Sequence, residues 1–391
     1  MRIYLDNAAS TRMDEEVLNE MLPFFRDQYA NPSGSSGFSA VVRKAVGKAR
    51  EQVASLIGAN ADEIIFTSGG TESDNIAIFG AGFSRGETGH RKIITTGIEH
   101  PAVLNPVREL SKKGFEVLYA PCDVAGMADT SFFAEHTDKN TALVSVMTAN
   151  NELGTIQDIA KIADKAHAAG ALLFTDAVQA VGHIPVDVGA FKADLLSISS
   201  HKLHGPKGVG ALYVRRGTDL SVYSFGGGQE RGLRSGTLNV PGIVGLGKAC
   251  EIASLNIEEV AERIRNLRNS FAKSILCGIP GSHINGIRED IGPDQGKCLP
   301  NILSVSFDGI EATSLLIELD MRGICCSTGS ACSMISGKSS HVLKAAGFSE
   351  ERIRGSVRFS MSKYTTREEL DHTVEALKES VGRLRRIMDN C

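Results

Sequence analysis

Seven short runs of mostly apolar residues alternate with longer stretches of mixed polarity between about residues 60 and 215. Several runs are continuously apolar, which is typical of strands covered on both faces. Many of the stretches between them, such as 156–169, have the length and spacing of amphipathic helices. This alternation predicts an α/β fold with a mostly parallel seven-stranded sheet and helices on both sides. The predicted strands are residues 63–67, 92–96, 115–119, 141–147, 171–175, 194–199 and 210–214.

The pattern changes after about residue 255 and predicts a smaller α+β domain. Its predicted elements are a helix over 257–276, a strand over 302–307, a helix over 312–322, a strand over 357–360 and a helix over 366–386. The first dozen residues are too few for a domain and should pack against one of the two. We therefore expect a large domain over 13–255 and a small domain formed by 1–12 and 256–391.

Composition and charge narrow the functional class. The 391 residues are 42% hydrophobic and 23% charged, with a net charge of −4 and no block of like charges, which argues against a nucleic-acid or membrane-surface protein. No apolar run approaches the ~20 residues of a membrane span, and the N-terminus meets an acid too early for a signal peptide. A cytoplasmic location is expected. The eight cysteines should then be mostly reduced thiols, with one cluster at Cys325, Cys326 and Cys332.

Polar residues follow three of the predicted strands, at the carboxyl ends where parallel α/β sheets bind ligands. The first set is Ser-Gly-Gly-Thr-Glu-Ser at 68–73, between a strand and a helix. Glycines let the backbone approach a ligand, and free N–H groups at a helix start favour a phosphate. An ordinary glycine turn with a threonine cap fits the same residues equally well.

The second and third sets suggest a cofactor with a pyridine ring. Asp176 follows a strand and precedes Gln179, and a carboxylate there could pair with a protonated ring nitrogen, although a helix cap is the commoner role. Lys202 follows the next strand and could form a Schiff base. A surface lysine and a metal site at His201 and His204 are the alternatives, and no other metal ligand lies at suitable spacing.

Together these motifs resemble the class V aminotransferase-fold enzymes that use pyridoxal 5′-phosphate (PLP), a type I PLP-dependent transferase fold. More narrowly, the chain resembles cysteine desulfurases of the NifS/IscS type. The matching blocks are YLDNAAST (4–11), NPS (31–33), FTSGGTESDN (66–75), EHPAV (99–103), NNELGTIQ (150–157), TDAVQAVGHIPVD (175–187), SSHKLHGPKGVGALYVR (199–215), GGGQERGLRSGTLN (226–239), STGSAC (327–332) and VRFS (357–360).

The resemblance implies a role for each matching position. It makes Lys202 the Schiff-base lysine, pairs Asp176 with the pyridine nitrogen and Gln179 with the ring hydroxyl, and stacks His100 on the ring, where it could also shuttle protons. The expected phosphate-binding residues are Gly70, Thr71, Ser199 and His201, with Thr237 reaching the neighbouring subunit's phosphate in a homodimer. Asn151 is expected beside the cofactor and, with Asn31 and Arg358, around the substrate carboxylate.

The same resemblance makes Cys332 the sulfur acceptor, in a Gly- and Ser-rich segment over 327–340 that should be mobile. The implied reaction takes sulfur from L-cysteine, leaves L-alanine and forms a persulfide on Cys332. The sulfur then passes to an acceptor protein, an iron–sulfur scaffold or a tRNA-thiolation protein, without direct nucleic-acid or membrane binding. No resident metal is implied, although Cys332 could transiently ligate an iron–sulfur cluster. For Cys325 and Cys326 a structural role is favoured over a thiol relay.

The sequence departs from the family pattern at one place, and three other functions are conceivable. Relatives usually continue Asn-Pro-Ser with Ser-x-His, whereas this chain has Ser36 in place of the histidine, in a segment (34–39) that borders the substrate entrance. A selenocysteine lyase or another C–S lyase could share the fold, and so could an aminotransferase, which would not need Cys332. A scaffold without activity is hard to reconcile with Lys202, Asp176 and Cys332 all being present.

Overall fold

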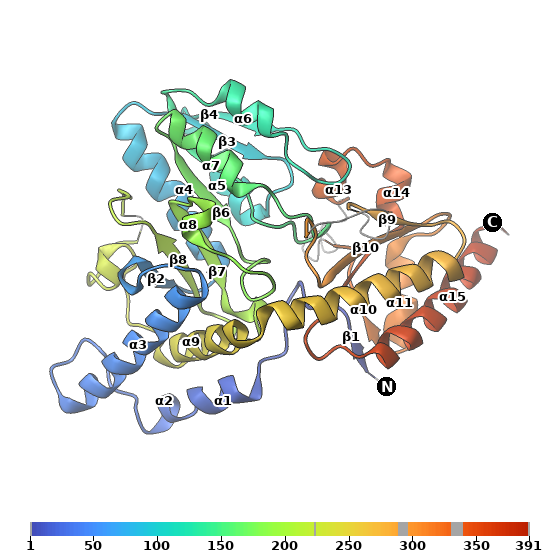
Figure 1. Ribbon diagram of the computed structural model, residues 1–391, viewed down its shortest axis with the longest axis horizontal. Helices are drawn as coiled ribbons and strands as arrows, with labels where there is room; N and C mark the ends of the chain where they lie inside the picture. The colour runs from blue at the N-terminus through green and yellow to red at the C-terminus, as the bar shows by residue number, and fades with distance from the viewer. Residues whose placement is uncertain (1, 223, 288–295, 330–338, 390–391) are drawn as a thin grey trace.

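A seven-stranded sheet forms the centre of the larger part of the computed structural model, which describes residues 2–222, 224–287, 296–329 and 339–389 (Figure 1). The strand order is β2-β8-β7-β6-β5-β3-β4, and only β8 runs antiparallel to its neighbours. The strands are β2 (Ile64–Thr67), β3 (Lys92–Thr96), β4 (Glu116–Ala120), β5 (Thr141–Ser145), β6 (Leu172–Asp176), β7 (Leu195–Ser199) and β8 (Gly210–Val214). The predicted mostly parallel seven-stranded sheet is confirmed.

Helices cover both faces of this sheet because successive strand side chains point to opposite sides. Ile64 and Phe66 of β2 pack with the helices α3 (Gly37–Leu56) and α9 (Val240–Leu255). Ile65, between them, packs instead with residues of α4 (Gly70–Glu87) and α5 (Pro101–Lys112). The helices α6 (Thr130–His136) and α7 (Ile159–Ala168) contribute a further apolar cluster with β3, β5 and β6.

The C-terminal part has its own sheet and its own apolar core. Its antiparallel strands lie in the order β12-β10-β9, with bounds Ser356–Ser360, Ile302–Phe307 and Ser282–Asn285. The core joins them to α10 (Ile257–Gly278), α11 (Ala312–Met321) and α15 (Arg367–Asp389). Figure 1 shows these three helices together on one side of that sheet. The smaller α+β region expected from the sequence is therefore present, while the boundary at residues 255/256 stays a prediction.

The N-terminus joins this second region. The two-residue strand β1 (Ile3–Tyr4) pairs in parallel with β11 (Ile324–Cys325), and Asp6 bridges to Ser360. Three helices between residues 15 and 56 were not among the predicted elements: α1 (Glu15–Met21), α2 (Pro23–Arg26) and α3. Two short helices, α13 (His341–Ala345) and α14 (Glu350–Arg354), were also not predicted.

None of the described helices is both long enough and apolar enough to cross a membrane. The cytoplasmic location stays a prediction.

Candidate active site

A cavity of about 540 Å³ opens at the carboxyl ends of the central strands. Residues that follow β2, β3, β5, β6 and β7 line it, together with Arg358 from β12 and residues 8–10 from the N-terminal segment. Parallel strands bring their carboxyl ends to one edge, which is why residues far apart in sequence meet here. The predicted residues that line it are Gly70, Thr71, His100, Asn151, Asp176, Gln179, Ser199, His201, Lys202 and Arg358.

One end of the cavity is a narrow backbone cradle at the start of α4. A Cβ on Gly70 would lie 2.7 Å from Cγ2 of Val178, and one on Gly210 would lie 2.7 Å from Cα of Gly69. Gly69 itself has φ +150, which side chains rarely adopt. Side chains on these glycines would fill the approach to the helix start, where free N–H groups favour an anion. The cradle fits a phosphate.

Asp176 lies at the end of β6 and is 6% exposed. Its Oδ1 accepts a hydrogen bond from the backbone N–H of Val178 at 2.9 Å and lies 3.5 Å from Oγ of Ser197. Burial raises the pKa of Asp176, while the fields of His100 and Lys202 act in the opposite direction. A cationic group bound beside this carboxyl would favour its ionised form.

Lys202 ends a short 3-10 turn that directly follows β7. Its Nζ donates to the backbone oxygens of Ala8 at 2.5 Å and Ala9 at 2.8 Å, while Gln179 Nε2 also donates to Ala8 at 3.0 Å. Behind the lysine, Nε2 of His183 lies 2.9 Å from the Lys202 carbonyl oxygen, and burial lowers the pKa of His183 to about 4. The N-terminal segment is therefore part of the site, a contribution that the sequence pattern did not predict.

His100 caps α5, and its Nδ1 accepts the backbone N–H of Ala102 at 3.1 Å. Burial is the main reason that the pKa of His100 is lowered. The neutral ring with an accepting Nδ1 carries its hydrogen on Nε2. His100 is thus a hydrogen donor at Nε2 in this structure.

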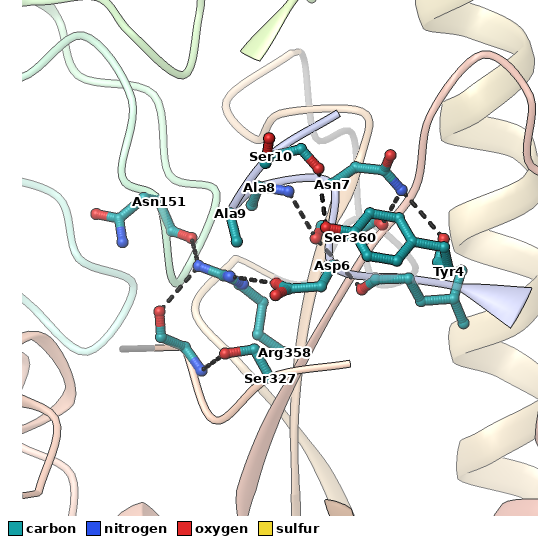
Figure 2. A network of polar contacts seen from close by, with 12 residues as sticks. Tyr4, Asp6, Asn7, Ala8, Ala9, Ser10, Asn151, Ser327, Arg358 and Ser360 are labelled. Carbon is teal, nitrogen blue, oxygen red and sulfur yellow. Dashed lines mark hydrogen bonds and ion pairs between the residues drawn. The ribbon is translucent and has the colours of Figure 1, made fainter. Parts of the chain in front are cut away.

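Arg358 is 3% exposed and reaches from β12 between the N-terminal segment and the loop after β5 (Figure 2). Its Nη2 lies 2.7 Å from Oδ1 of Asp6, and its Nη1 donates to the backbone oxygens of Asn151 at 2.8 Å and Gly329 at 2.9 Å. Its buried Nε has no hydrogen-bond partner among the described residues. A buried cation with an unsatisfied donor at the cavity suits an anionic ligand group.

Two predicted site residues that the structure describes do not line this cavity, and a third lies outside the described residues. Asn31 is exposed, and its Oδ1 accepts the N–H of Ser33 at 2.9 Å. Thr237 is exposed in the loop before α9. Cys332 lies outside the described residues, as does most of the segment over 327–340.

The other two clustered cysteines have thiols whose ionisation is disfavoured. Burial is the main cause that raises the pKa of both Cys325 and Cys326, more strongly for Cys326. A raised pKa keeps a cysteine in the less reactive thiol form.

Sequence reasoning missed five further cavity residues with ionisable side chains, which are Glu72, Asp74, Glu152, Lys207 and His341. All of them except His341 lie inside motifs that were recognised for their neighbours, so the signal was present but unassigned. His341 begins α13, and its Nε2 lies 2.9 Å from the backbone oxygen of Glu99. A lone histidine in an unpredicted short helix carries no comparable pattern.

The donor set fits PLP. A glycine cradle suits the phosphate, Asp176 the ring nitrogen, Lys202 the aldehyde carbon and His100 the ring face. Within the described residues, no group of three or more His, Cys, Asp or Glu side chains could hold a metal ion.

Comparisons with known proteins agree with this geometry. Residues 3–373 match the family model described as aminotransferase class-V. The chain is 45% identical to a cysteine desulfurase of Trichormus azollae over 383 residues, covering 98% of this chain and 94% of that protein. It is also 45% identical to the cysteine desulfurase IscS of Dictyoglomus turgidum over 385 residues, covering 98% and 96%.

Solved structures give the same result. A NifS-like protein superposes with a TM-score of 0.91 at 40% identity, covering 98% of this chain and all of that one (100%). A structure described as SspA in complex with cysteine superposes with a TM-score of 0.81 at 36% identity, covering 94% and 100%. The chain therefore belongs to the class-V aminotransferase family and, within it, to the PLP-dependent cysteine desulfurases.

Proposed function

We propose that this chain removes sulfur from L-cysteine, releasing L-alanine and forming a persulfide on Cys332. The observation that carries the proposal is the convergence of Lys202, Asp176 and Arg358 on one cavity. Lysine and carboxylate at opposite ends of a PLP ring, with an arginine beside them, suit an amino-acid substrate. The related SspA structure in complex with cysteine supports that choice of amino acid.

The cofactor would be held by the cradle at Gly70 and Thr71, by Asp176 at the ring nitrogen and by Lys202 at the aldehyde carbon. When bound, PLP supplies an electron sink for the electrons released at the substrate's α-carbon. Ser199 and His201 also line the cavity and would complete the phosphate contacts. Gln179 would reach the ring hydroxyl.

Arg358 would bind the substrate carboxylate. Its position is already fixed by Asp6 and by two backbone oxygens, so little side-chain entropy is lost when a carboxylate arrives. The unpartnered Nε gives it a spare donor within the described structure. Asn151 would contribute from the neighbouring loop, and Asn31, which is exposed in the single chain, would have to be brought in by a partner or by rearrangement.

Lys202 and His100 have different roles in this proposal. The Lys202 amine would take the α-proton of the substrate once it is free to do so. Neutral His100 carries its hydrogen on Nε2, so it would donate a hydrogen bond from that nitrogen to a bound ligand. Because burial lowers its pKa, His100 would have to take up a proton before it could give one away as an acid.

Cys332 would take the sulfur. Its thiolate attacks the substrate sulfur, the bond between that sulfur and the β-carbon breaks, and the electron pair stays with the three-carbon fragment, which leaves as alanine after protonation. Burial raises the pKa values of Cys325 and Cys326, which keeps both as thiols, and a thiol is a poorer nucleophile than a thiolate. The persulfide would then pass to an acceptor protein, such as an iron–sulfur scaffold or a tRNA-thiolation protein.

A homodimer would complete the site, with Thr237 contacting the phosphate of the partner's cofactor. Several large exposed apolar side chains lie on α1, α2, the start of α3 and the segments that join them: Leu18, Leu22, Phe25, Tyr29, Phe38 and Val41. Apolar side chains clustered in this way suit a protein interface. Thr237 itself is exposed and does not line the cavity of its own chain.

Steady-state turnover of L-cysteine tests the proposal. We expect equal amounts of alanine and transferable sulfur from the wild type, and loss of both in Cys332→Ala. Cys326→Ala is the matched control and should keep most of the activity. Undiminished alanine production by Cys332→Ala would instead indicate a C–S lyase that releases sulfur without a protein persulfide.

A further inference from the structure

Glu152 lines the cavity, and the proposed mechanism gives it no role. It lies in the loop after β5, next to Asn151, and is 2% exposed. Its backbone is held in place because its N–H donates to Oδ1 of Asn150 at 2.9 Å. A carboxyl withdrawn from water needs polar partners. The contacts of this carboxyl are with residues on either side of the segment that carries Cys332.

The first contact is with Ser340, which follows that segment and begins α13. The hydroxyl of Ser340 donates to Oε2 of Glu152 at 2.5 Å. The same hydroxyl oxygen accepts the backbone N–H of Leu343 at 3.1 Å and so caps the helix. One buried hydroxyl therefore ties the start of α13 to the wall of the cavity.

The second contact is with Gly329, which precedes the segment. A Cβ on Gly329 would lie 2.8 Å from Oε2 of Glu152, so the backbone passes directly against the same oxygen, with φ at +94. The carbonyl oxygen of Gly329 accepts Nη1 of Arg358 at 2.9 Å, and this nitrogen also donates to the backbone oxygen of Asn151 at 2.8 Å (Figure 2). Gly329 is thus held between Glu152 and the substrate-binding arginine.

Both sides of the segment therefore meet one carboxyl oxygen beside the proposed substrate site. Cys332 comes three positions after Gly329, so chain connectivity keeps the two Cα atoms within about 11 Å of each other. Holding Gly329 and Ser340 together excludes chain conformations in which the thiol would be far from the substrate. Because transfer between two groups requires them to be close and aligned, the rate of sulfur transfer should depend on these contacts.

We propose that Glu152 is a positioning residue for sulfur transfer, which holds Gly329 and Ser340 together and so keeps Cys332 within reach of the substrate. The inference rests on the proposed role of Cys332 as the sulfur acceptor. Glu152 acts through the chain on either side of Cys332 and takes no part when Lys202 removes the α-proton. Only the step in which sulfur reaches Cys332 should therefore depend on it.

Two reactions of the holoenzyme separate this role from a merely structural one. L-Alanine has no sulfur, so exchange of its α-hydrogen in D2O needs Lys202 but not Cys332. Rapid quenching after mixing with L-cysteine, followed by mass measurement of the Cys332 peptide, gives the rate of sulfur transfer. In Glu152→Ala we expect sulfur transfer to slow about tenfold, while exchange at saturating L-alanine stays within about twofold of the wild type.

Three further variants identify the contact that matters. Ser340→Asp keeps an acceptor that caps α13 but loses the hydrogen given to Glu152, so it should slow sulfur transfer as much as Glu152→Ala. Glu152→Gln keeps an oxygen that can accept this hydrogen and should stay within about threefold of the wild type. Ser349→Ala is the matched control, since the Ser349 hydroxyl caps α14 by accepting the N–H of Arg352 at 3.3 Å, and it should change neither reaction.

Hydrogen exchange of the backbone in the apoenzyme gives a readout that does not depend on the cofactor. Glu152→Ala should speed exchange in the peptides that contain residues 327–329 and 340–345, because both lose a contact with the same carboxyl. Ser349→Ala should leave both peptides as they are in the wild type.

Three results would overturn the inference. They are an equal loss of sulfur transfer and alanine exchange in Glu152→Ala, wild-type sulfur transfer in Ser340→Asp, and unchanged backbone exchange of both peptides in Glu152→Ala. A wild-type enzyme that exchanges the α-hydrogen of L-alanine but gains no sulfur on Cys332 would instead contradict the proposed role of Cys332 itself.

Discussion

Arg358 illustrates what could and could not be predicted at the scale of a residue. The sequence predicted that Arg358 lies in a Val-Arg-Phe-Ser strand, and the family resemblance implied that it binds the substrate carboxylate. Its actual restraints are the backbone oxygens of Asn151 and Gly329 and the carboxylate of Asp6. The hydrogen bonds from Lys202 to the carbonyls of Ala8 and Ala9 are likewise made to backbone oxygens. Backbone oxygens have no side-chain signature, so these contacts become visible only after the chain folds.

Arg358→Lys tests the carboxylate-binding role directly. Lysine keeps the charge but loses the planar fork, so we expect the KM for L-cysteine to rise about 30-fold with a smaller change in kcat. Steady-state kinetics measure both constants. Arg352→Lys, whose guanidinium contacts Asn285 and Ile284, is the control. An unchanged KM for Arg358→Lys would remove Arg358 from the substrate site.

At the scale of elements, the seven central strands were predictable because their apolar runs are rich in β-branched residues and are bounded by polar turns. Helix α3 was also predictable in principle. Its buried residues Val42, Val46, Ala49 and Val53 repeat at helical spacing. They were missed because elements were predicted only from about residue 60 onward. The pairing of β1 with β11 was not predictable, because two-residue strands have no period and their partners lie over 300 residues apart.

The loop before α9 depends on a buried ion pair that fixes an unusual backbone. Arg50 of α3 donates through two nitrogens to Glu230, at 2.8 and 2.6 Å, and the backbone N–H of Phe66 donates to the same carboxylate at 2.7 Å. Glu230 and Arg231 both have positive φ, at 48 and 58. The pair therefore stabilises a strained turn in the loop that carries Thr237.

Glu230→Ala should lower the free energy of unfolding by about 3 kcal/mol, because it leaves the Arg50 charge and the Phe66 N–H without their acceptor. Urea unfolding measures the change. Asp62→Ala breaks a similar two-nitrogen contact with Arg216 at the surface and should leave the unfolding midpoint unchanged. Equal effects of the two substitutions would contradict a stabilising role for the buried pair.

At the scale of the whole molecule, buried carboxyls make stability depend on pH. Burial raises the pKa of Glu99 from 4.5 to about 8. Between these values the unfolded chain is ionised at this position while the folded chain keeps its proton. Stability is therefore lost as pH rises from about 4.5 to 8 and changes no further above that range.

Glu99→Gln should remove this dependence. Between pH 6 and pH 8.5 we expect the apoenzyme's free energy of unfolding to fall by roughly 2 kcal/mol more in the wild type than in the variant. Urea unfolding at fixed protein concentration provides the comparison. Parallel pH profiles for the two proteins would show that Glu99 is ionised in the fold.

The proposed dimer makes a separate prediction. Phe38 is 77% exposed at the start of α3, and Met321 is 80% exposed on α11. Phe38→Glu should shift the mass in light scattering from twice 41.7 kDa to 41.7 kDa and weaken PLP binding about tenfold, because the partner's Thr237 is lost. Met321→Glu should change neither. A Phe38→Glu monomer with normal PLP affinity would exclude Thr237 from the partner's site.

The proposed reaction needs two nucleophiles, Lys202 at the cofactor and Cys332 at the sulfur. A direct test is to mix the holoenzyme with one equivalent of L-cysteine and measure the mass of the Cys332 peptide, with Lys202→Ala as the control. We expect a gain of one sulfur on that peptide, matched by one alanine, and neither product in the control. Alanine formed without added sulfur on Cys332, or sulfur gained in the Lys202→Ala protein, would contradict the proposed reaction.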